Sequence, residues 1–382
     1  MDDTQAVVVG AGTAGLATAA ALRRAGVAAV VLDQADAIGA SWRSRYDRLK
    51  LNSSRWTSKL PKAPYAEGTP LYPARDAVVD YLERHAADNE LDVRLATRVE
   101  RIEAEDGGWL VRTSSGDFRT RQLVIATGFE HTPSIPGWPG RGDFKGRLLH
   151  AAEYRNAQPF RDQDVLVVGP GCSGMEIAYD LAEGGARNVR IAVRTTPNIV
   201  LRDPRFPADL PPQALVKLPP RVGDALMKLV RRRMIGDLSE HGLPWPEEGV
   251  FSRLRREGKA PAIVDKEVVE AIRQRRIGIV AGLESLDETG VTLADGTRLE
   301  PDAVIAATGY SRGLEPLLGH LGVLDERGIP RRHAAEAAAP GLRFIGYLPR
   351  PGQIREMGRQ AERAARAIAR ELGTASGGRA AA

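Results

Sequence analysis

Cysteine is almost absent from this chain of 382 residues, which contains only Cys172. A single thiol can form no internal disulfide, no cysteine zinc cluster and no redox-active CxxC pair. Cys172 stands between the glycines of a short turn, where a small residue packed against a helix is the first interpretation. A reactive thiol is the second interpretation, because the N-terminus of a helix lowers the pKa of a thiol.

Long hydrophobic runs and a leader peptide are also lacking. The longest apolar stretches, such as AVVVG at 6–10 and VLVV at 165–168, have the length of a strand, whereas a membrane helix needs about 20 apolar residues. The chain opens with the acidic Met1-Asp2-Asp3 and shows no basic, then apolar, then small-residue leader. We therefore expect a cytoplasmic protein without a membrane span.

Aromatic residues are scarce, at 5% of the chain, and the excess of basic charge is small, with a formal net charge of +5. The densest basic cluster, Arg231-Arg232-Arg233, has no interleaved aromatic residue, which makes it a weak indication of nucleic-acid binding. Solvated arginines explain the charge, and we expect no nucleic-acid partner. The six histidines lack the spacing of metal ligands, so we expect no metal site.

Glycine, in contrast, is plentiful and forms two turns of the same kind. The first turn, Gly10-x-Gly12-x-x-Gly15, follows an apolar strand and precedes an alanine-rich helix. The first glycine permits a tight turn, the second lets the backbone approach a pyrophosphate, and the third allows close packing of the helix on the strand. The helix N-terminus attracts the phosphates. Asp33 ends the next strand, where we expect it to accept hydrogen bonds from a ribose.

The second turn has Gly169, Gly171 and Gly174 in the same strand-to-helix context. At the end of its next strand, however, the acid is replaced by Arg194, followed by Thr195. A carboxylate there would repel a 2′-phosphate, whereas a guanidinium offers it paired donors. The second turn is therefore predicted to prefer NADPH over NADH. A solvated arginine at a strand end is the alternative interpretation of Arg194.

Two further residues near the second turn have a possible part in nucleotide binding. Arg202 is a second candidate for the arginine that binds the 2′-phosphate of NADPH. Ser173 lies in the motif GCSG, which follows a dinucleotide strand and not a nucleophile elbow, so a phosphate donor is the better interpretation than a catalytic nucleophile.

Two such turns on one chain predict two bound dinucleotides, as in proteins that pass electrons between a nicotinamide and a flavin. The order of segments predicts an α/β fold with two nested Rossmann-like dinucleotide-binding domains. The first domain is split in sequence and covers 1–155 and 311–382, and the second is inserted into it and covers 156–310. Residues 197–262, which are rich in proline and basic residues, are predicted to be a helical and loop insertion that shapes the substrate site.

Between the two turns lies the pattern Phe144-x-Gly146-x-x-x-His150-x-x-x-Tyr154. It resembles the fingerprint of the class B flavoprotein monooxygenases, which include flavin-containing monooxygenases, plant YUCCA enzymes and Baeyer–Villiger monooxygenases. The segment GASWRSRYDRLKLN at 39–52 is similar to the one that follows the first turn in YUCCA-type members. The resemblance covers nearly the whole chain.

The resemblance implies FAD in the first domain and NADPH in the second. It implies that NADPH reduces FAD and that O₂ then forms a flavin C4a-(hydro)peroxide, which transfers one oxygen atom to a small organic substrate. Oxygenation of an amine or sulfide and attack on a ketone or 2-oxo acid both stay open. The rival function is a reductase or oxidase that passes electrons to an acceptor without oxygenating a substrate. The oligomeric state is open, with a homodimer among the options.

The resemblance also suggests roles for single residues. Asn52 is similar to the asparagine beside the flavin peroxide, and an Asx-turn or helix cap is its alternative. Trp42 and Arg43 resemble residues that pack along FAD, with core packing and a surface arginine as the alternatives. Gln353 opens the last helix, whose start approaches the flavin ring in this superfamily. The fingerprint lies at the interdomain linker in the family, which makes His150 an anchoring residue and not a general base.

The turns and the resemblance together predict two sets of cofactor residues. For FAD they are Gly10, Gly12, Ala14, Gly15, Asp33, Gln34, Trp42, Arg43, Val99, Thr127, Gly128 and Gln353. For NADPH they are Gly169, Gly171, Cys172, Ser173, Gly174, Arg194, Thr195, Thr308 and Gly309. The linker set is Phe144, Gly146, His150 and Tyr154.

Overall fold

A computed structural model of the chain describes residues 2–203, 219–257, 260–348 and 352–374. The chain divides into two compact units. Unit 1 consists of Met1–Arg43, Arg55–Thr132 and Tyr310–Ala382, and unit 2 consists of Ser44–Ser54 and Pro133–Gly309. Both units are α/β structures with a sheet whose central strands are parallel, as the alternation of apolar strands and helices predicted.

Unit 1 is built on a seven-stranded sheet in the order β3-β2-β1-β6-β5-β4, with β19 paired to β6. Its parallel strands are β1 (Asp2–Val9), β2 (Ala29–Leu32), β3 (Asp92–Arg94), β6 (Phe118–Ile125) and β19 (Leu342–Phe344). The antiparallel strands β4 (Val99–Glu105) and β5 (Gly108–Thr113) complete it. The apolar stretch of β1 is buried on both faces, as is typical of a central parallel strand.

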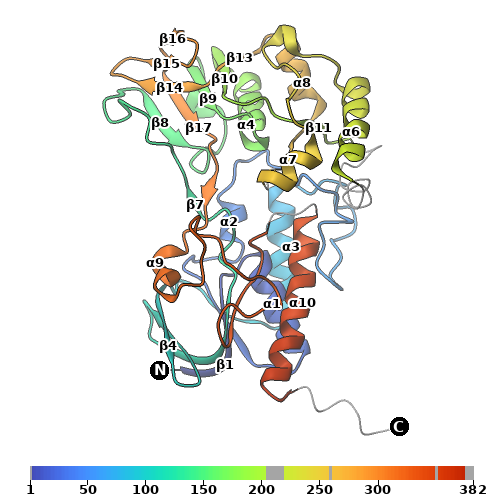
Figure 1. The fold of residues 1–382 in the computed structure, drawn as a ribbon, viewed down its shortest axis with the longest axis vertical. Helices are drawn as coiled ribbons and strands as arrows, with labels where there is room; N and C mark the ends of the chain where they lie inside the picture. The colour runs from blue at the N-terminus through green and yellow to red at the C-terminus, as the bar shows by residue number, and fades with distance from the viewer. Residues whose placement is uncertain (1, 204–218, 258–259, 349–351, 375–382) are drawn as a thin grey trace. The chain divides into compact units, whose positions relative to one another are not determined.

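The helices of unit 1 include α1 (Thr13–Arg24), α2 (Ala40–Arg43), α3 (Arg75–Asp88), α9 (Glu315–Leu318) and α10 (Gln353–Glu371). Helix α10, drawn red in Figure 1, packs against α1, drawn blue, although they stand at opposite ends of the sequence. Small alanines on both helices permit this close packing, since Ala17, Ala20, Ala361 and Ala364 are all buried. The C-terminal segment therefore completes the unit that the N-terminus begins.

Unit 2 is built on a five-stranded parallel sheet in the order β13-β10-β9-β17-β8. Its strands are β8 (Arg147–His150), β9 (Asp164–Val168), β10 (Asn188–Val193), β13 (Ile277–Ala281) and β17 (Ala303–Ala306). A separate antiparallel sheet contains β14 (Leu283–Leu286), β15 (Val291–Leu293) and β16 (Arg298–Leu299). Strands β11 (Ile199–Leu201) and β12 (Ala262–Val264) form a parallel pair. The short strand β7 (Thr132–Pro133), at the boundary of the two units in the sequence, pairs with β18 (Tyr310–Ser311), which belongs to unit 1.

The described part of unit 2 contains α-helices and short 3₁₀ turns. The α-helices include α4 (Cys172–Glu183), α6 (Pro220–Met234), α7 (Val250–Glu257) and α8 (Lys266–Arg273). The 3₁₀ turns η1 (Gln158–Phe160) and η2 (Ser239–His241) belong to this unit, and η3 (Gly319–Leu321) belongs to unit 1. No helix in the described ranges is long and apolar enough to cross a membrane.

The boundaries of the units differ from the predicted domain boundaries at 155/156 and 310/311. Residues 44–54 and 133–155, predicted to belong to the first domain, lie in unit 2, and Tyr310 lies in unit 1. Residues 133–155 lie in unit 2 because they include β8, which pairs with β17 in the parallel sheet of that unit. Of the predicted insertion 197–262, residues 204–218 and 258–259 lie outside the described residues.

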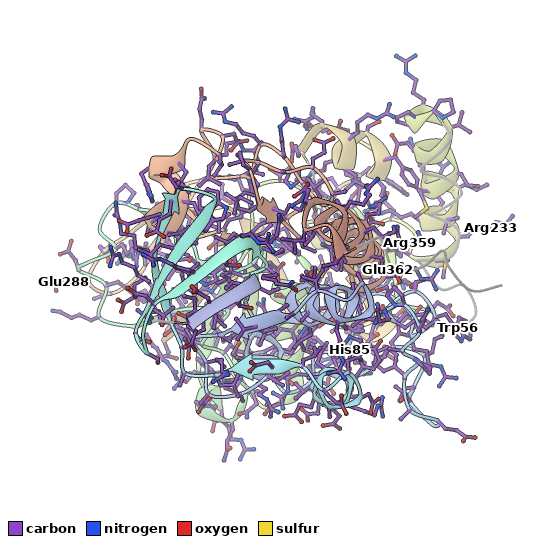
Figure 2. The ribbon with its side chains drawn as sticks, turned by 90° about the horizontal axis from the view of Figure 1, so that it is seen from below. Trp56, His85, Arg233, Glu288, Arg359 and Glu362 are labelled. Carbon is purple, nitrogen blue, oxygen red and sulfur yellow. The ribbon has the colours of Figure 1, made fainter. Side chains whose placement is uncertain are left out.

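The three arginines at 231–233, near the end of α6, differ in their exposure to solvent. Arg231 is only 6% exposed and its guanidinium lies 4.6 Å from the centroid of the Trp245 ring. Arg232 and Arg233 are exposed, and Figure 2 labels Arg233 near the end of the helix. The three arginines therefore do not form one exposed patch.

Two cofactor turns and the residues around them

The three glycines of the first turn differ in what a side chain at each position would contact. Gly10 has a φ of +111°, and a Cβ there would lie 2.7 Å from the carbonyl oxygen of Ala126. A Cβ on Gly15 would overlap the carbonyl oxygen of Gly10. A Cβ on Gly12 would meet no protein atom within 4 Å. The outer glycines are thus required by the fold, whereas the space beside Gly12 is open to a ligand at the start of α1.

Asp33 connects the end of β2 to this turn. Its Oδ2 accepts a hydrogen bond from the backbone N of Ala11 at 2.5 Å, and its Oδ1 accepts one from Ala35 N at 2.8 Å. A carboxylate has about four acceptor positions, so two remain for hydroxyl groups of a ribose. The neighbouring Gln34 is exposed. The backbone carbonyl of Asp33 accepts from Thr97 N at 2.7 Å, which brings the chain just before Val99 to the same place.

Other predicted FAD residues lie around the start of α1 or at element ends in unit 1. The Nε1 of Trp42 donates to Thr13 Oγ1 at 3.4 Å, so this ring lies beside the first residue of α1. Thr127 is anchored by Tyr347, whose hydroxyl oxygen accepts from Thr127 N at 3.2 Å. Gly128 has a φ of +93° and open space beside it. Ala14 is buried inside α1.

Arg43 and Gln353 each donate a hydrogen bond to a nearby backbone carbonyl oxygen. Arg43 is exposed, forms an ion pair with Glu83 and donates from Nε to the carbonyl oxygen of Ile38 at 3.1 Å. This geometry agrees with the surface-arginine alternative. Gln353 is the first residue of α10, and its Nε2 donates to the carbonyl oxygen of Leu348 at 3.1 Å.

The second turn repeats the construction of the first. Gly169 has a φ of +113°, and its Cβ would lie 2.6 Å from the carbonyl oxygen of Ala307. A Cβ on Gly174 would overlap the carbonyl oxygen of Gly169, and one on Gly171 would meet nothing within 4 Å. Each turn also lies beside an Ala-Thr-Gly segment, at 126–128 in unit 1 and at 307–309 in unit 2. The internal repeat in the sequence is therefore a structural repeat.

The two arginines considered for the 2′-phosphate differ sharply in their surroundings. Arg194 follows β10, is exposed together with Thr195, and makes no hydrogen bond or ion pair with any residue in the described ranges. Arg202 is only 6% exposed and forms ion pairs with Glu176 and Asp265. A phosphate would have to displace these carboxylates to reach Arg202, so the geometry favours Arg194.

The remaining predicted NADPH residues are tied to neighbouring backbone. The Sγ of Cys172 accepts a hydrogen bond from Ile263 N at 3.2 Å and is half-buried, which fits the small packed residue and not a reactive thiol. Ser173, next to it, lies in the first turn of α4. The hydroxyl of Thr308 donates to the carbonyl oxygen of Ser134, and Gly309 accepts at its carbonyl oxygen from Ser134 N at 3.0 Å.

The first half of the fingerprint is a packing motif within unit 2. The ring of Phe144 lies directly over Gly146, so that a Cβ on Gly146 would overlap it. The carbonyl oxygen of Asp302 would be 3.1 Å away on another side. The pair Phe-x-Gly is thus explained by a ring that covers a residue without a side chain.

We expect Gly146→Ala to lower the free energy of unfolding by about 1–3 kcal/mol, the usual cost of an overpacked methyl group. Gly142→Ala is the control, since a Cβ there meets no atom within 4 Å. Urea denaturation of the two variants measures the difference. Equal stabilities would show that the Phe144 ring moves aside without cost.

In the second half of the fingerprint, the side chain of His150 is held by hydrogen bonds to the backbone. The Nδ1 of His150 accepts from Ala152 N at 3.0 Å, and its Nε2 donates to the carbonyl oxygen of Gly309 at 3.0 Å. Burial lowers the pKa of this imidazole, which favours the neutral ring that these two bonds require. Both nitrogens are engaged by backbone, so the geometry supports an anchoring residue. The buried Tyr154 donates to Asp180 Oδ2 at 2.6 Å, which ties the fingerprint to α4, and burial raises the pKa of its phenol.

Asn52 lies in the segment 44–54, which is attached to unit 2. Its Oδ1 accepts a hydrogen bond from Arg202 Nη2 at 2.9 Å. Earlier in the segment, Tyr46 donates to Glu176 Oε2 at 2.6 Å. Sequence reasoning missed this attachment. A signal was present, because the stretch 175–181 of α4 is apolar except for two acids one turn apart, Glu176 and Asp180, and each needs a partner.

The chain is similar to several known proteins. A family model described as pyridine nucleotide-disulphide oxidoreductase matches residues 7–218. The probable indole-3-pyruvate monooxygenase YUCCA8 of Arabidopsis thaliana is 34% identical over 358 residues, which are 89% of this chain and 83% of that protein. The indole-3-pyruvate monooxygenase YUCCA1 of Oryza sativa subsp. japonica is 34% identical over 84% of this chain and 80% of its own.

The chain belongs to the class B flavoprotein monooxygenases. It is accordingly a flavin-dependent monooxygenase that uses FAD and NADPH, as the glycine turns and the fingerprint predicted. Solved structures agree at the level of the fold. A mutant flavin monooxygenase from Stenotrophomonas maltophilia has a TM-score of 0.76 at 24% identity, over 97% of this chain and 100% of that one. A cyclohexanone monooxygenase has a TM-score of 0.75 at 17% identity, over 98% and 88%.

Proposed function

We propose that unit 1 of this class B monooxygenase binds FAD, that unit 2 binds NADPH, and that the enzyme transfers one oxygen atom from O₂ to a small 2-oxo acid. The observation that carries the proposal is the repeated turn. Each unit has one glycine turn in which the outer glycines are needed for the fold and the middle glycine faces open space. A nucleotide pyrophosphate explains why a residue without a side chain stands there.

The chain itself binds and orients the two cofactors. The N–H groups at the starts of α1 and α4 are free of intrahelical partners, and they donate to the pyrophosphates beside Gly12 and Gly171. The remaining acceptor positions of Asp33 hold the FAD ribose, and Arg194 holds the 2′-phosphate of NADPH. When bound, NADPH supplies a hydride, and FAD carries the electrons to O₂, so that one oxygen atom enters the substrate and the other leaves as water.

The substrate class rests on the relatives. The most similar proteins named above are indole-3-pyruvate monooxygenases, and the similarity covers more than four fifths of this chain. Their named substrate is a 2-oxo acid. The insertion 197–262 contributes to substrate choice, and its helix α6 carries exposed apolar residues, among them Leu226 and Leu229 at 43% and 56% exposure.

The test is NADPH consumption by the purified enzyme under ¹⁸O₂ with a panel of 2-oxo acids, ketones, amines and sulfides. We expect a 2-oxo acid to give CO₂ and a carboxylic acid one carbon shorter that carries one labelled oxygen. Labelled product from another class would keep the monooxygenase and overturn the substrate class. Oxidation of NADPH without labelled product from any class would favour the rival reductase or oxidase.

Arg194→Ala should weaken NADPH binding by about 1.5–3 kcal/mol, the range for a hydrogen bond to a charged group, and leave NADH binding nearly unchanged. The reason is that NADH has no 2′-phosphate for the guanidinium to bind. Dissociation constants of both nucleotides measure the effect. Arg298→Ala, which removes an exposed arginine of β16, is the control for net charge. Equal losses for NADPH and NADH would refute the phosphate role.

A further inference from the structure

The loop that follows β10 and carries Arg194 is fixed at its far end. Arg194 is exposed, whereas Asn198 is only 7% exposed. The Nδ2 of Asn198 donates to the carbonyl oxygen of Glu248 at 3.0 Å, and the carbonyl oxygen of Asn198 accepts from Ala262 N at 2.8 Å. Both partners lie in the second half of the insertion, so the insertion folds back onto this loop.

A further contact from the insertion lies closer to Arg194. The Nη1 of Arg253, on α7, donates to the carbonyl oxygen of Thr196 at 3.1 Å. The side chain of Arg253 is 19% exposed, and its Nε lies 3.5 Å from Glu257 Oε2, so the guanidinium is also held on its own helix. Because Thr196 stands two positions after Arg194, this bond fixes the backbone beside the residue that we expect to bind the phosphate.

Helix α7 is itself held at its start by α6. The carboxylate of Asp224 accepts from Phe251 N at 2.7 Å and from Ser252 N at 3.3 Å. A carboxylate at this end satisfies free N–H groups and complements the helix dipole. The ring of Phe251 is 7% exposed and packs against Gly223, where a Cβ would lie 2.6 Å from it. Arg253 therefore donates to the loop from a helix that has a defined place in unit 2.

Gly282 contacts the start of the same loop. It follows β13, is buried, and accepts at its carbonyl oxygen from Ala294 N at 2.8 Å. A Cβ on Gly282 would lie 3.2 Å from both Cα and Cβ of Arg194. The backbone of Arg194 is thus packed against one side, and the carbonyl oxygen of Thr196 is bonded by Arg253. These two contacts restrict the backbone of the loop.

We propose that Arg253 is a positioning residue for NADPH: it holds the carbonyl oxygen of Thr196 and so sets the loop conformation in which Arg194 binds the 2′-phosphate. A guanidinium forms paired bonds to a phosphate only in a suitable orientation, and a loop that is ordered beforehand loses less entropy on binding. The insertion then also determines how strongly unit 2 prefers NADPH over NADH. The inference rests on the proposed function, which places the 2′-phosphate at Arg194.

The test compares the dissociation constants of NADP⁺ and NAD⁺ for the enzyme loaded with FAD, measured by isothermal titration calorimetry. We expect Arg253→Met to weaken NADP⁺ binding about 10-fold, in the range for a hydrogen bond from a charged group, and to leave NAD⁺ binding nearly unchanged. Arg255→Met is the matched control, because it removes an exposed arginine from the same helix. This control should bind both nucleotides as the unmodified enzyme does.

A double variant separates positioning from direct contact with the phosphate. If Arg253 acts through Arg194, the double variant Arg194→Ala/Arg253→Met should bind NADP⁺ no more weakly than Arg194→Ala, as expected for two residues that act as one unit. Losses that multiply in the double variant would overturn the positioning role. If Arg253→Met does not fold, Arg253→Gln takes its place with the same expectations, because its shorter side chain also lacks the guanidinium.

The single variants distinguish failure of this inference from failure of the proposed function. If Arg194→Ala loses the preference for NADP⁺ and Arg253→Met keeps it, the positioning role of Arg253 is wrong and the phosphate role of Arg194 stands. Equal losses of NADP⁺ and NAD⁺ in Arg253→Met would likewise overturn the inference, since they would reflect damage to the fold. If Arg194→Ala keeps the preference, the phosphate lies elsewhere, and both the proposed site and the inference are refuted.

Discussion

Gly12→Ala should yield a folded protein that does not bind FAD. The backbone at Gly12, with φ −87° and ψ −172°, is accessible to any residue, and a Cβ there would meet no protein atom within 4 Å. The new methyl group therefore costs the fold almost nothing. It occupies the space in which we place the pyrophosphate, so we expect FAD affinity to fall at least ~100-fold, about 3 kcal/mol.

Flavin absorbance and thermal melting of the purified variant check this result. Gly171→Ala is the matched control in unit 2, where the Cβ is equally free of protein contacts. That variant should keep its yellow colour and lose NADPH affinity. A Gly12→Ala protein with a full complement of flavin would show that the first turn does not hold the FAD pyrophosphate.

Gly15→Ala should fail at the level of folding, although it changes the same turn by the same methyl group. Here the Cβ would overlap the carbonyl oxygen of Gly10, and neither backbone can move without separating α1 from β1. Overpacking against side chains costs about 1–3 kcal/mol, and a contact with rigid backbone belongs at or above the upper limit. We expect the free energy of unfolding to fall by about 3 kcal/mol or more.

Denaturant titration of the protein without added flavin measures this loss, with Gly12→Ala as the reference. The two variants thereby separate a glycine that serves the fold from a glycine that serves the ligand. If Gly15→Ala unfolded at the same denaturant concentration as Gly12→Ala, the close packing of α1 on the turn would not be needed for stability.

Sequence reasoning succeeded where the pattern is local. The strand, turn and helix around Gly10 and around Gly169 follow from apolar periodicity and glycine spacing within about 30 residues, the size of a βαβ unit. The contrast between Asp33 and Arg194 is visible in the sequence, because each residue follows the strand that comes after its glycine turn. The cofactor pair, FAD and NADPH, followed from these features and from the fingerprint at 144–154.

Prediction was poorer where contacts are distant in sequence. The domain boundary near 155 was placed too late, because the pairing of β8 with β17 joins residues from opposite ends of unit 2. Arg202 was considered for a phosphate, whereas its partners turned out to be the buried Glu176 and the partly exposed Asp265. Charge and residue type cannot tell an arginine that awaits a ligand from one that is already paired.

The amino-acid order alone was thus sufficient for the α/β class, the two glycine turns and the family, because each depends on patterns that act over a few residues or one supersecondary unit. Folding in three dimensions decided that residues 44–54 join unit 2 and that Asn52 is oriented by Arg202. Those contacts span 130 positions for Tyr46 and Glu176 and 150 for Asn52 and Arg202. Bonds over such separations leave no periodic pattern in the chain, so only the assembled structure reveals them.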